Sequence, residues 1–546
     1  MSLAAALLTA ALLTADPSPA PASACTDTAP LGAIGSGPRD LERLAELAGR
    51  APVRPHLFVR PSSDRALVLC DGAAPHPSAL EPTGSSGPGA ELGPAFSRTI
   101  WRSGYPEDWN DGAVWQGRGV TQALGASAEV SWGPLSAAVA PLVAWTENRA
   151  FPLRPPPPAA PPPGASPWAN PFYSGIDLPL RFGASDFWTF DPGDSYVRVD
   201  AWNVGVGVSN ENIWWGPGVR NAVLFTNTAP GFPHAFIGTS HPADIWIGWL
   251  DVQALWGLPQ QSRWLTANGA RDRRLLTALA ASFEPAFAPG LFLGVARVFE
   301  YRGIPSASTW FRPLVQPFLK EQLQTASNPT GDSTDNQLAS FMARWVIPAA
   351  RLEIYGEWGR DDNSANMTDL LMEPGHSAAW VLGLQHLAAV RGRWVRVGLE
   401  ATTTVEPPLH RDWRPDPIFY THYYETAGHT NDGQMLGAGI GPSSESQTLT
   451  VDVLDPRGGS FGGFVERVLR NERWYDDHLG TFDGHDLELS AGVRQTVALQ
   501  SLDVTWSLAV SRRWHAYFGP ELFNVAASVE VAAWPGRRAA PALPPP

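Results

Sequence analysis

The sequence predicts an all-β fold, a transmembrane antiparallel β-barrel with a small helical segment at its N-terminus. Three observations support this prediction. The 546 residues include 52 Gly and 53 Pro and only 17% charged residues, which excludes a coiled coil, and with 10% aromatic residues the chain is too apolar to stay disordered. Apolar and polar residues alternate with period two from about residue 96 onward. Beyond the first 24 residues, no apolar run reaches the roughly 18 residues of a membrane-spanning helix.

The first 24 residues resemble an export signal. Residues 3–15 form an apolar stretch that is too short to span a bilayer, and the sequence ASA at 22–24 is a small-x-small cleavage site. No Lys or Arg precedes the apolar stretch, which departs from the usual pattern. We expect residues 1–24 to be a signal peptide that is removed before Cys25, and the mature protein to reach the outer membrane.

The two cysteines allow two interpretations. Cys25 follows the cleavage site directly, as in a lipoprotein, but Ala22 occupies the position where such signals usually have Leu. Alternatively, Cys25 and Cys70 form a disulfide that closes a loop of about 45 residues. We prefer the disulfide, because exported chains commonly pair their cysteines. Neither cysteine has a catalytic setting.

Residues 25–95 predict a small helical and loop-rich segment. Between Pro38 and Arg50, three leucines share one helical face, with the Pro near the start and Gly49 at the end. A Gly/Ser/Pro tract at 83–94 follows and separates this segment from the strands. We expect a separate helical element here, and whether it plugs the barrel is left open.

Residues 96–534 predict the barrel itself. Apolar residues alternate with polar or small ones in the segments 394–404, 487–497 and 501–512, which reach the 9–11 residues or so of a tilted membrane strand. About 16–18 such segments can be counted. In one region, residues 197–208, the alternation changes face, which a β-bulge or a wrongly placed strand would explain.

The connections between the expected strands are unequal. Short turns alternate with long irregular stretches, as in outer-membrane barrels, where long loops gather at one end. The last strand ends near Trp534, and residues 535–546 form a Pro-rich tail. The long stretches lie at 150–175, 302–336, 405–434 and 471–484.

Four motifs stand out from this general pattern. They are NDGAVWQGRG at 110–119, NENIWWGPG at 210–218, YGEWGRDD at 355–362 and GHTNDGQMLGAGIGP at 428–442. Their order and spacing resemble the Wzi family of capsule-assembly outer-membrane proteins. The resemblance implies a barrel of about 18 strands with a small helical element near its periplasmic end. It also implies a lectin that holds capsular or related exopolysaccharide at the cell surface.

The second motif supplies the first candidates for sugar binding. Trp214 and Trp215 could offer flat faces to a sugar ring, while Asn210 and Glu211 bond to its hydroxyls. The alternative is that both tryptophans belong to the core or to the membrane belt.

The long loop before the fourth motif supplies the second group of candidates. Tyr420, His422, Tyr423, Tyr424 and His429 make it rich in aromatic residues, which suits glycan contact if the loop faces outward. The alternative is an inward-folded loop that plugs the pore. The histidines lack the spacing of a zinc site, so no metal is expected.

Charged residues near the third motif predict a structural network. Arg351, Glu353 and Glu357 share the polar face of one strand, and we expect them to neutralise one another in the lumen. Asp361 and Asp362 follow as solvated acids, since no calcium-loop pattern surrounds them.

In the first motif, Asp111 and Arg118 are expected to pair with each other. Such a pair would have a structural role.

Function classes can be excluded on charge and geometry. A net charge of −14 argues against nucleic acid as a partner. Glu353 and Glu357 lie about 13 Å apart on one strand face, too far for a glycosidase pair, and no catalytic motif or cofactor site is present. We therefore expect a monomeric, non-enzymatic barrel that contacts polysaccharide and outer-membrane lipids. A substrate-specific porin and a secreted glycan hydrolase are the alternatives.

Overall fold

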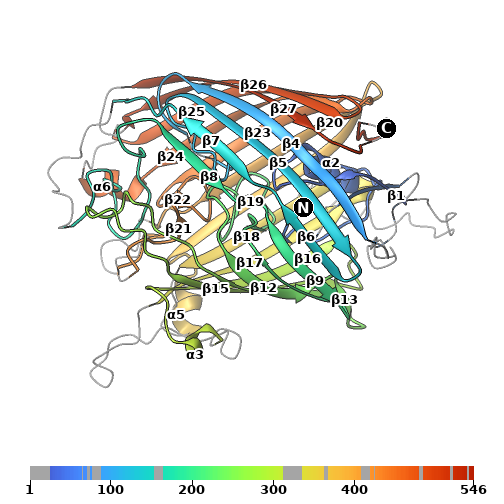
Figure 1. Cartoon of the computed structure of the whole chain (residues 1–546), viewed down its shortest axis with the longest axis horizontal. Coiled ribbons are helices and arrows are strands. Elements are labelled where there is room, and N and C mark those ends of the chain that lie inside the picture. The colour runs from blue at the N-terminus through green and yellow to red at the C-terminus, as the bar shows by residue number, and fades with distance from the viewer. Residues whose placement is uncertain are drawn as a thin grey trace, which may run out of the picture.

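The structure is a computed structural model that forms a closed antiparallel β-barrel with an N-terminal segment at one end (Figure 1). It describes residues 25–63, 66–70, 74, 76, 88–107, 109–152, 164–311, 335–361, 367–407, 418–423, 425–478, 484–516, 521–537 and 540–546. The expected signal peptide lies outside the described residues, and so does the Pro-rich stretch at 153–163.

The barrel has 18 strands within the described residues, which confirms the predicted fold class. Three of them are interrupted, so that β6 and β7, β8 and β9, and β12 and β13 each make one strand. Pairing of β27 with β4 closes the cylinder. The segments are β4 (Gly89–Arg102), β5 (Gly119–Trp132), β6 (Leu135–Val139), β7 (Leu142–Thr146), β8 (Phe187–Asp191), β9 (Tyr196–Ala201), β10 (Val204–Ser209), β12 (His234–Thr239), β13 (Ala243–Asp244), β14 (Gly248–Gly257), β15 (Leu275–Pro285), β16 (Leu291–Tyr301), β17 (Asp335–Ile347), β18 (Leu352–Asp361), β19 (Ala378–Val390), β20 (Arg393–Thr403), β23 (Glu445–Leu454), β24 (Gly459–Arg470), β25 (Asp486–Ala498), β26 (Leu502–Trp514) and β27 (Leu522–Ala533).

Short elements lie at the two ends of the barrel and inside it. Three two-stranded sheets pair β1 (Cys25–Pro30) with β3 (Ala66–Cys70), β2 (Phe58–Val59) with β11 (Trp214–Trp215), and β21 (Thr430–Asn431) with β22 (Gln434–Met435). The helices are α2 (Gly37–Leu47), α3 (Ala307–Trp310), α5 (Met367–Met372) and α6 (Glu472–His478), with one 3-10 turn, η2 (Pro348–Ala350). Among the described residues, no helix is long and apolar enough to cross a membrane.

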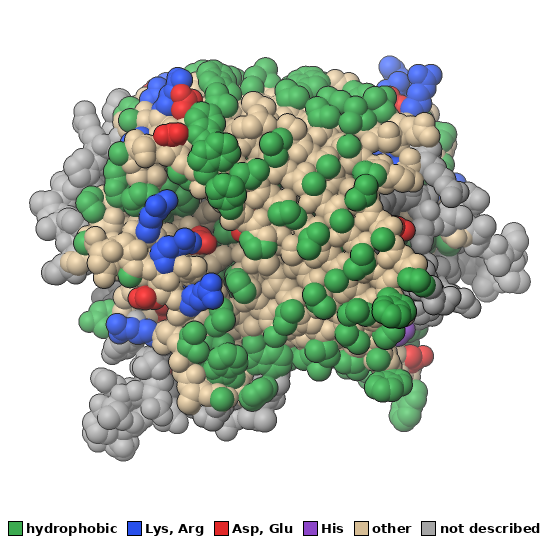
Figure 2. Space-filling view, in the orientation of Figure 1, with side chains coloured by type: hydrophobic (Ala, Val, Ile, Leu, Met, Phe, Trp, Pro, Cys, Tyr) green, Lys and Arg blue, Asp and Glu red, His purple; other side chains and the backbone are tan. Residues whose placement is uncertain are grey.

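Alternation along each strand places polar side chains inside and apolar ones outside. In β20, Arg396 and Glu400 are buried in the interior, whereas Leu399 between them is 46% exposed on the outer wall. The same pattern recurs around the cylinder, and Figure 2 shows hydrophobic side chains spread over its outer surface. A closed barrel with an apolar outer wall is the transmembrane form of the fold.

The two ends of the barrel differ in their connections. All the turns at one end are short, for example two residues between β19 and β20, while the nine connections at the other end are longer. The start of β4 and the end of β27 both lie at the short-turn end, where α2 and the C-terminus are seen at the right of Figure 1. By the usual asymmetry of such barrels, the short turns face the periplasm and the long loops face outward.

The change of face at residues 197–208 has a simpler cause than a bulge. β9 and β10 are two strands joined by a turn of Trp202 and Asn203, both of which have positive φ. Val199 lies opposite Val206, so all the valines point outward. The β-bulge is therefore wrong, and the alternative of a wrongly placed strand is confirmed, because two strands joined by a tight hairpin occupy the region taken as one.

The barrel begins earlier than residue 96, the expected boundary. β4 starts at Gly89 and pairs with β5 from its first residue, Gly89 opposite Ser131. The sequence did not predict this part of the strand, because the start of β4 overlaps the Gly/Ser/Pro tract at 83–94. Pairing with a neighbouring strand outweighed low intrinsic strand propensity.

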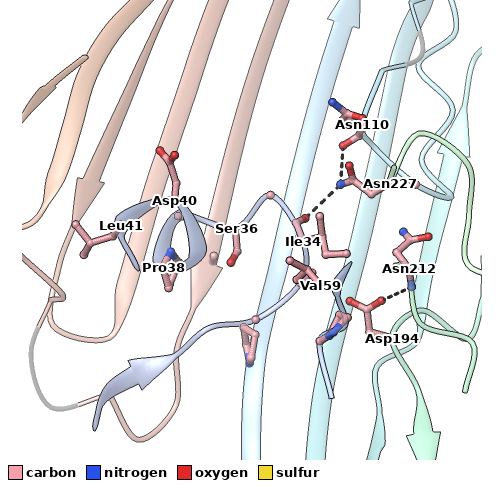
Figure 3. A pocket seen from close by; sticks show the side chains of 18 of the residues that line it. Ile34, Ser36, Pro38, Asp40, Leu41, Val59, Asn110, Asp194, Asn212 and Asn227 are labelled. Carbon is pink, nitrogen blue, oxygen red and sulfur yellow. Dashed lines mark hydrogen bonds between the residues drawn. The ribbon is translucent and has the colours of Figure 1, made fainter. Parts of the chain in front are cut away.

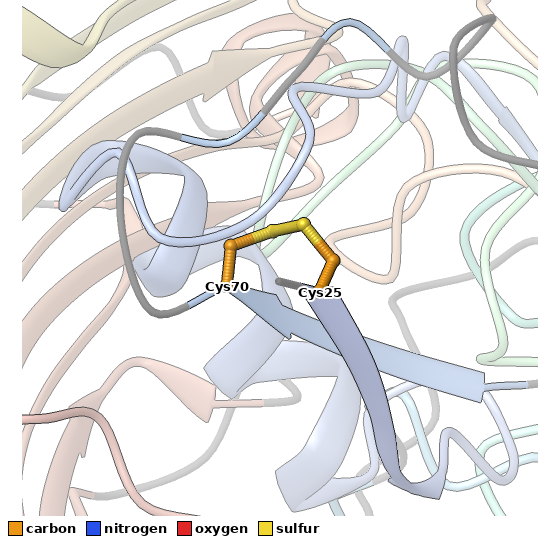
Figure 4. Close-up of a disulfide and its surroundings, with 2 residues drawn as sticks. All are labelled: Cys25 and Cys70. Carbon is orange, nitrogen blue, oxygen red and sulfur yellow. A yellow bond between two sulfur atoms is a disulfide. The ribbon is translucent and has the colours of Figure 1, made fainter. Parts of the chain in front are cut away.

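The N-terminal segment forms the helix that the sequence predicts, and a disulfide cross-links the segment. α2 packs Leu44 and Leu47 into a small core with Leu387 and Trp394 at the periplasmic end of the barrel. A disulfide joins Cys25 to Cys70 over a separation of 45 residues (Figure 4). The sulfur of Cys25 is therefore occupied, which removes the lipoprotein alternative for this structure.

We expect reduction of this disulfide, or the double substitution Cys25→Ser and Cys70→Ser, to loosen the N-terminal segment. Closing a loop of this length removes about 4 kcal/mol of chain entropy from the open state. Protease protection of residues 25–63 should fall, while the barrel keeps its shift between unboiled and boiled samples on a gel. Equal protection with and without reductant would contradict this account.

The Pro-rich tail packs against the barrel mouth. Among its described residues, Leu543 is 2% exposed and joins the core that contains Leu47 and Trp394. The indole of Trp394 donates to the carbonyl of Pro544 at 2.7 Å. The tail therefore helps to hold the N-terminal segment at the periplasmic end.

Candidate functional site

The loop after β10 folds into the barrel and forms the centre of a plug. Its short strand β11 pairs with β2 of the N-terminal segment, so that Trp215 lies opposite Phe58. Trp215 is fully buried, with ring centroids 5.4 Å from Phe58 and 5.2 Å from Phe225, both edge to face. The plug thus joins a periplasmic segment to a loop that enters from the opposite end.

The structure contradicts the prediction that this loop offers sugar-stacking faces. Trp214 and Trp215 are 7% and 0% exposed. Glu211 is also fully buried, where it accepts hydrogen bonds from Ser62 and Arg60, and Asn210 bonds to a backbone carbonyl. Their burial confirms the alternative that the two tryptophans belong to the core. The sequence could not decide between the two settings, because a Gly-Pro-Gly turn fits both equally well.

A second inward loop covers the first one from the outer side. The hydroxyl of Tyr420 donates to the carbonyl of Val223 at 2.7 Å, and His429 lies 3.0 Å from the carboxylate of Glu300. Tyr420 and His429 are fully buried. The prediction that they contact glycan is wrong, and the plugging alternative holds for this part of the loop.

The rest of the predicted aromatic group differs in exposure. Tyr423 is 84% exposed, and His422 is half-buried with its Nδ1 accepting from the backbone of Glu425. Tyr424 lies outside the described residues. Tyr423 is thus the one member of this group, among the described residues, whose side chain is mostly exposed at the surface.

Ion pairs across the lumen hold the plug in place. Arg344 of β17 lies between two carboxylates, with distances of 2.7 Å to Glu353 of β18 and 2.7 Å to Glu46 of α2. Arg43 of α2 donates to Glu353 at 2.9 Å. The predicted lumen network is therefore present, and its cations come mostly from residues that the sequence did not single out.

Other carboxylates of the lumen accept hydrogen bonds from the plug backbone. Glu357 accepts from the amide of Val223 at 3.0 Å, and Glu400 accepts from that of Asn221 at 2.7 Å. Arg351 does not belong to this network, contrary to the prediction. It follows η2 in a periplasmic turn with φ of 50° and lies over the ring of Trp394, because the strand begins only at the next residue.

Two further predictions for the motif residues need correction. Asp111 pairs with Arg98 at 2.6 Å rather than with Arg118, which donates to the carbonyl of Ser103. Asp361 is buried and accepts from the amide of Tyr420, so it is not a solvated acid. Asp362 lies outside the described residues. Pairing across a folded loop could not be read from sequence spacing.

The Glu46 carboxylate makes the plug sensitive to acid. Burial raises the pKa of Glu46, but His56 and Arg344 more than offset this and hold it below 4.5. A lowered folded pKa stabilises the protein above the unfolded pKa, and this contribution is lost as pH falls through the folded value. We expect protease protection of the N-terminal segment to decrease below about pH 4.5.

The matched variants for this experiment are Glu46→Gln and Glu91→Gln. Glu46→Gln should weaken protection at pH 7 and flatten its pH dependence, whereas Glu91, which is exposed on β4, should tolerate the change. Equal acid sensitivity in both variants would show that another group is responsible.

A cavity of about 2300 Å³ fills the lumen on the side of the N-terminal segment (Figure 3). Asn227 bridges its wall by donating to the carbonyls of Ile34 at 3.2 Å and Asn110 at 3.1 Å. Asp194 accepts from the amide of Asn212 at 2.9 Å. The loop between β4 and β5 lies across the outer end of this cavity, since Asn110 and its neighbours in that loop line the cavity.

One group of potential metal ligands lies among the described residues. Glu472 and Asp476 of α6 and His485 bring ligand atoms within 4.8 Å of one another. The imidazole of His485 already lies 3.0 Å from the carboxylate of Glu472, so a hydrogen bond between them accounts for the arrangement. Sequence spacing did not reveal it, because His485 reaches the helix only through the fold.

The protein-family comparison finds a match to the model described as capsule assembly protein Wzi, over residues 105–457. This chain belongs to the Wzi family. The match covers more than half of the chain and includes the two inward loops that form the plug. A comparison with curated proteins finds no match.

One solved structure, that of a Wzi protein, supports the barrel fold. The Wzi outer-membrane protein of Escherichia coli, described as a carbohydrate-binding β-barrel involved in group 1 capsule assembly, is 14% identical with a TM-score of 0.54. The alignment covers 80% of this chain and 83% of that one. OccK2 of Pseudomonas aeruginosa is 13% identical, with 81% and 97% covered and a TM-score of 0.41. A BenF-like porin of Pseudomonas fluorescens Pf-5 is 11% identical, with 81% and 99% covered and a TM-score of 0.41.

Proposed function

We propose that this protein is a non-enzymatic outer-membrane lectin that attaches capsular or related exopolysaccharide to the cell surface. The observation that carries the proposal is the Wzi-family match across residues 105–457. The Escherichia coli Wzi protein, which has the same fold, is described as carbohydrate-binding. Export depends on the signal peptide at residues 1–24, and the barrel acts as a monomer.

The arrangement of the outer wall, the long loops and the plug fits this role. The outer wall holds the barrel in lipid, and the long loops present their exposed residues at the opposite end from the disulfide-linked segment. The plug is tied to the barrel wall by buried ion pairs, as between Arg344 and Glu353. A fixed plug gives the loops a rigid base, which lowers the entropy cost of binding a long polymer.

Direct binding tests the proposal. The purified protein in detergent, immobilised on a surface, should bind polysaccharide isolated from its own host and should not bind an unrelated neutral dextran. Absence of binding to the host polysaccharide, by a protein that still shifts on heating, would overturn the proposed function.

A channel is the second candidate, because a lumen cavity of about 2300 Å³ is large enough for hydrophilic solutes. The plug argues against it. We expect little current through the wild-type protein in planar bilayers, and steady single-channel conductance would favour the porin instead.

A further inference from the structure

Two of the long loops are joined into one platform at the outer end of the barrel. The loop between β7 and β8 and the loop between β14 and β15 meet in a bridge that pairs Ala165 with Thr266. Asp177 in the first loop accepts hydrogen bonds from the amide of Ser262 at 2.5 Å and from its hydroxyl at 2.7 Å. These contacts fix the position of the two loops relative to each other.

Each loop contributes a tryptophan to the platform. Trp168 and Trp264 are half-buried, with ring centroids 6.2 Å apart and planes at 73°. Neither indole N–H is hydrogen-bonded to another described residue, and neither is a buried unsatisfied atom. Both N–H groups are therefore reachable from solvent, unlike that of Trp215, which is buried without a partner.

The platform also carries a local excess of positive charge. Residues 258–274 contain four arginines and one aspartate, in a chain with a net charge of −14. Arg263 is exposed and lies over the ring of Trp264 at 5.0 Å, and Arg273 is exposed as well. Among the described residues, neither has a carboxylate within ion-pair distance, and Asp432, the partner of Arg271, interacts with Arg273 only at longer range. Figure 2 shows basic side chains at the loop end, at the left, with acidic ones among them.

We propose that Trp168, Trp264, Arg263 and Arg273 form the polysaccharide contact, and that they bind a sugar residue bearing a carboxylate. An indole face packs against the apolar face of a sugar ring, and its N–H donates to a ring substituent. An unpaired guanidinium at the surface makes charge-assisted hydrogen bonds to a carboxylate. This inference rests on the proposed function and assigns it a site and a ligand class.

Two variants and two controls test the site. Arg263→Gln with Arg273→Gln removes the free charges, and Trp264→Ala removes one ring. Arg391→Gln with Arg457→Gln makes the same charge change in periplasmic turns, where both residues are exposed, and Trp202→Ala removes an exposed ring there. All four proteins should keep the heat-dependent gel shift of the wild type.

Binding is measured against an acidic host polysaccharide and against the same polymer after its carboxyl groups are reduced to alcohols. Each platform variant should bind the acidic polymer about tenfold more weakly, and both controls should match the wild type. The wild type should bind the reduced polymer about tenfold more weakly too. Equal binding by the platform variants would overturn the site, and equal binding of the reduced polymer would overturn the ligand class. Failure of the wild type to bind either polymer would instead overturn the proposed function.

Discussion

Replacing Arg344 by methionine is expected to release the plug from the barrel wall. The guanidinium is fully buried between Glu46 and Glu353, and its removal leaves two buried carboxylates short of a partner. Breaking one side of such a network costs roughly 3–5 kcal/mol, because the remaining charges stay desolvated. Protease sites in residues 25–63 should become accessible, and current through planar bilayers should rise.

Arg467→Met is the matched control for this variant. Arg467 also pairs with a glutamate, Glu445, but both side chains are more than 30% exposed. Exposed pairs contribute about 0–1 kcal/mol. A similar loss of protection in both variants, or no change in Arg344→Met, would contradict the role of the buried pair.

Trp215→Ala is expected to destabilise the plug by a comparable amount. The side chain is fully buried between Phe58 and Phe225, and truncation of such an aromatic residue costs roughly 3–5 kcal/mol. Thermal unfolding followed by tryptophan fluorescence should shift to lower temperature, and β2 should separate from β11.

Trp202→Ala provides the comparison, since Trp202 is 97% exposed in a periplasmic turn. Its removal should change the unfolding free energy by less than about 0.5 kcal/mol. If Trp215→Ala kept wild-type stability but lost polysaccharide binding, the tryptophan would act as a sugar contact and the core assignment would fail.

The barrel could be predicted from sequence because the alternation of polar and apolar residues along a strand is a local pattern. In β20, the alternation of Arg396 and Glu400 with Leu399 decides which face meets lipid, whatever the distant contacts are. The helix at 37–47 likewise follows from leucine spacing and flanking residues. The boundary at Gly89 escaped prediction because strand pairing outweighed composition.

The direction of the loops could not be predicted. Trp215 precedes a Gly-Pro-Gly turn and Tyr420 lies in an aromatic-rich loop, and both compositions suit either an outer binding surface or a folded plug. Their burial depends on pairing with Phe58 and on a bond to Val223, which come from distant parts of the chain. Arg344 was missed for the same reason, since its partners lie in α2 and β18.

The candidate contact site at Trp168 and Trp264 also depends on tertiary structure. The two tryptophans are 96 positions apart, and only the bridge between the loops brings them together. The run of arginines at 263–274 was a signal that the sequence did contain. Whether these arginines can bind a ligand depends on which of them have buried partners, as Arg274 does, and which are exposed without an ion pair.

Retention of polysaccharide on cells tests the central claim most directly. The measurement compares cell-associated with released polysaccharide in a host strain that lacks this gene, before and after the wild-type gene is restored. We expect the deletion strain to make the polymer but to release it into the medium, and the restored strain to keep it on the surface. Equal amounts of cell-bound polymer in both strains would contradict the account.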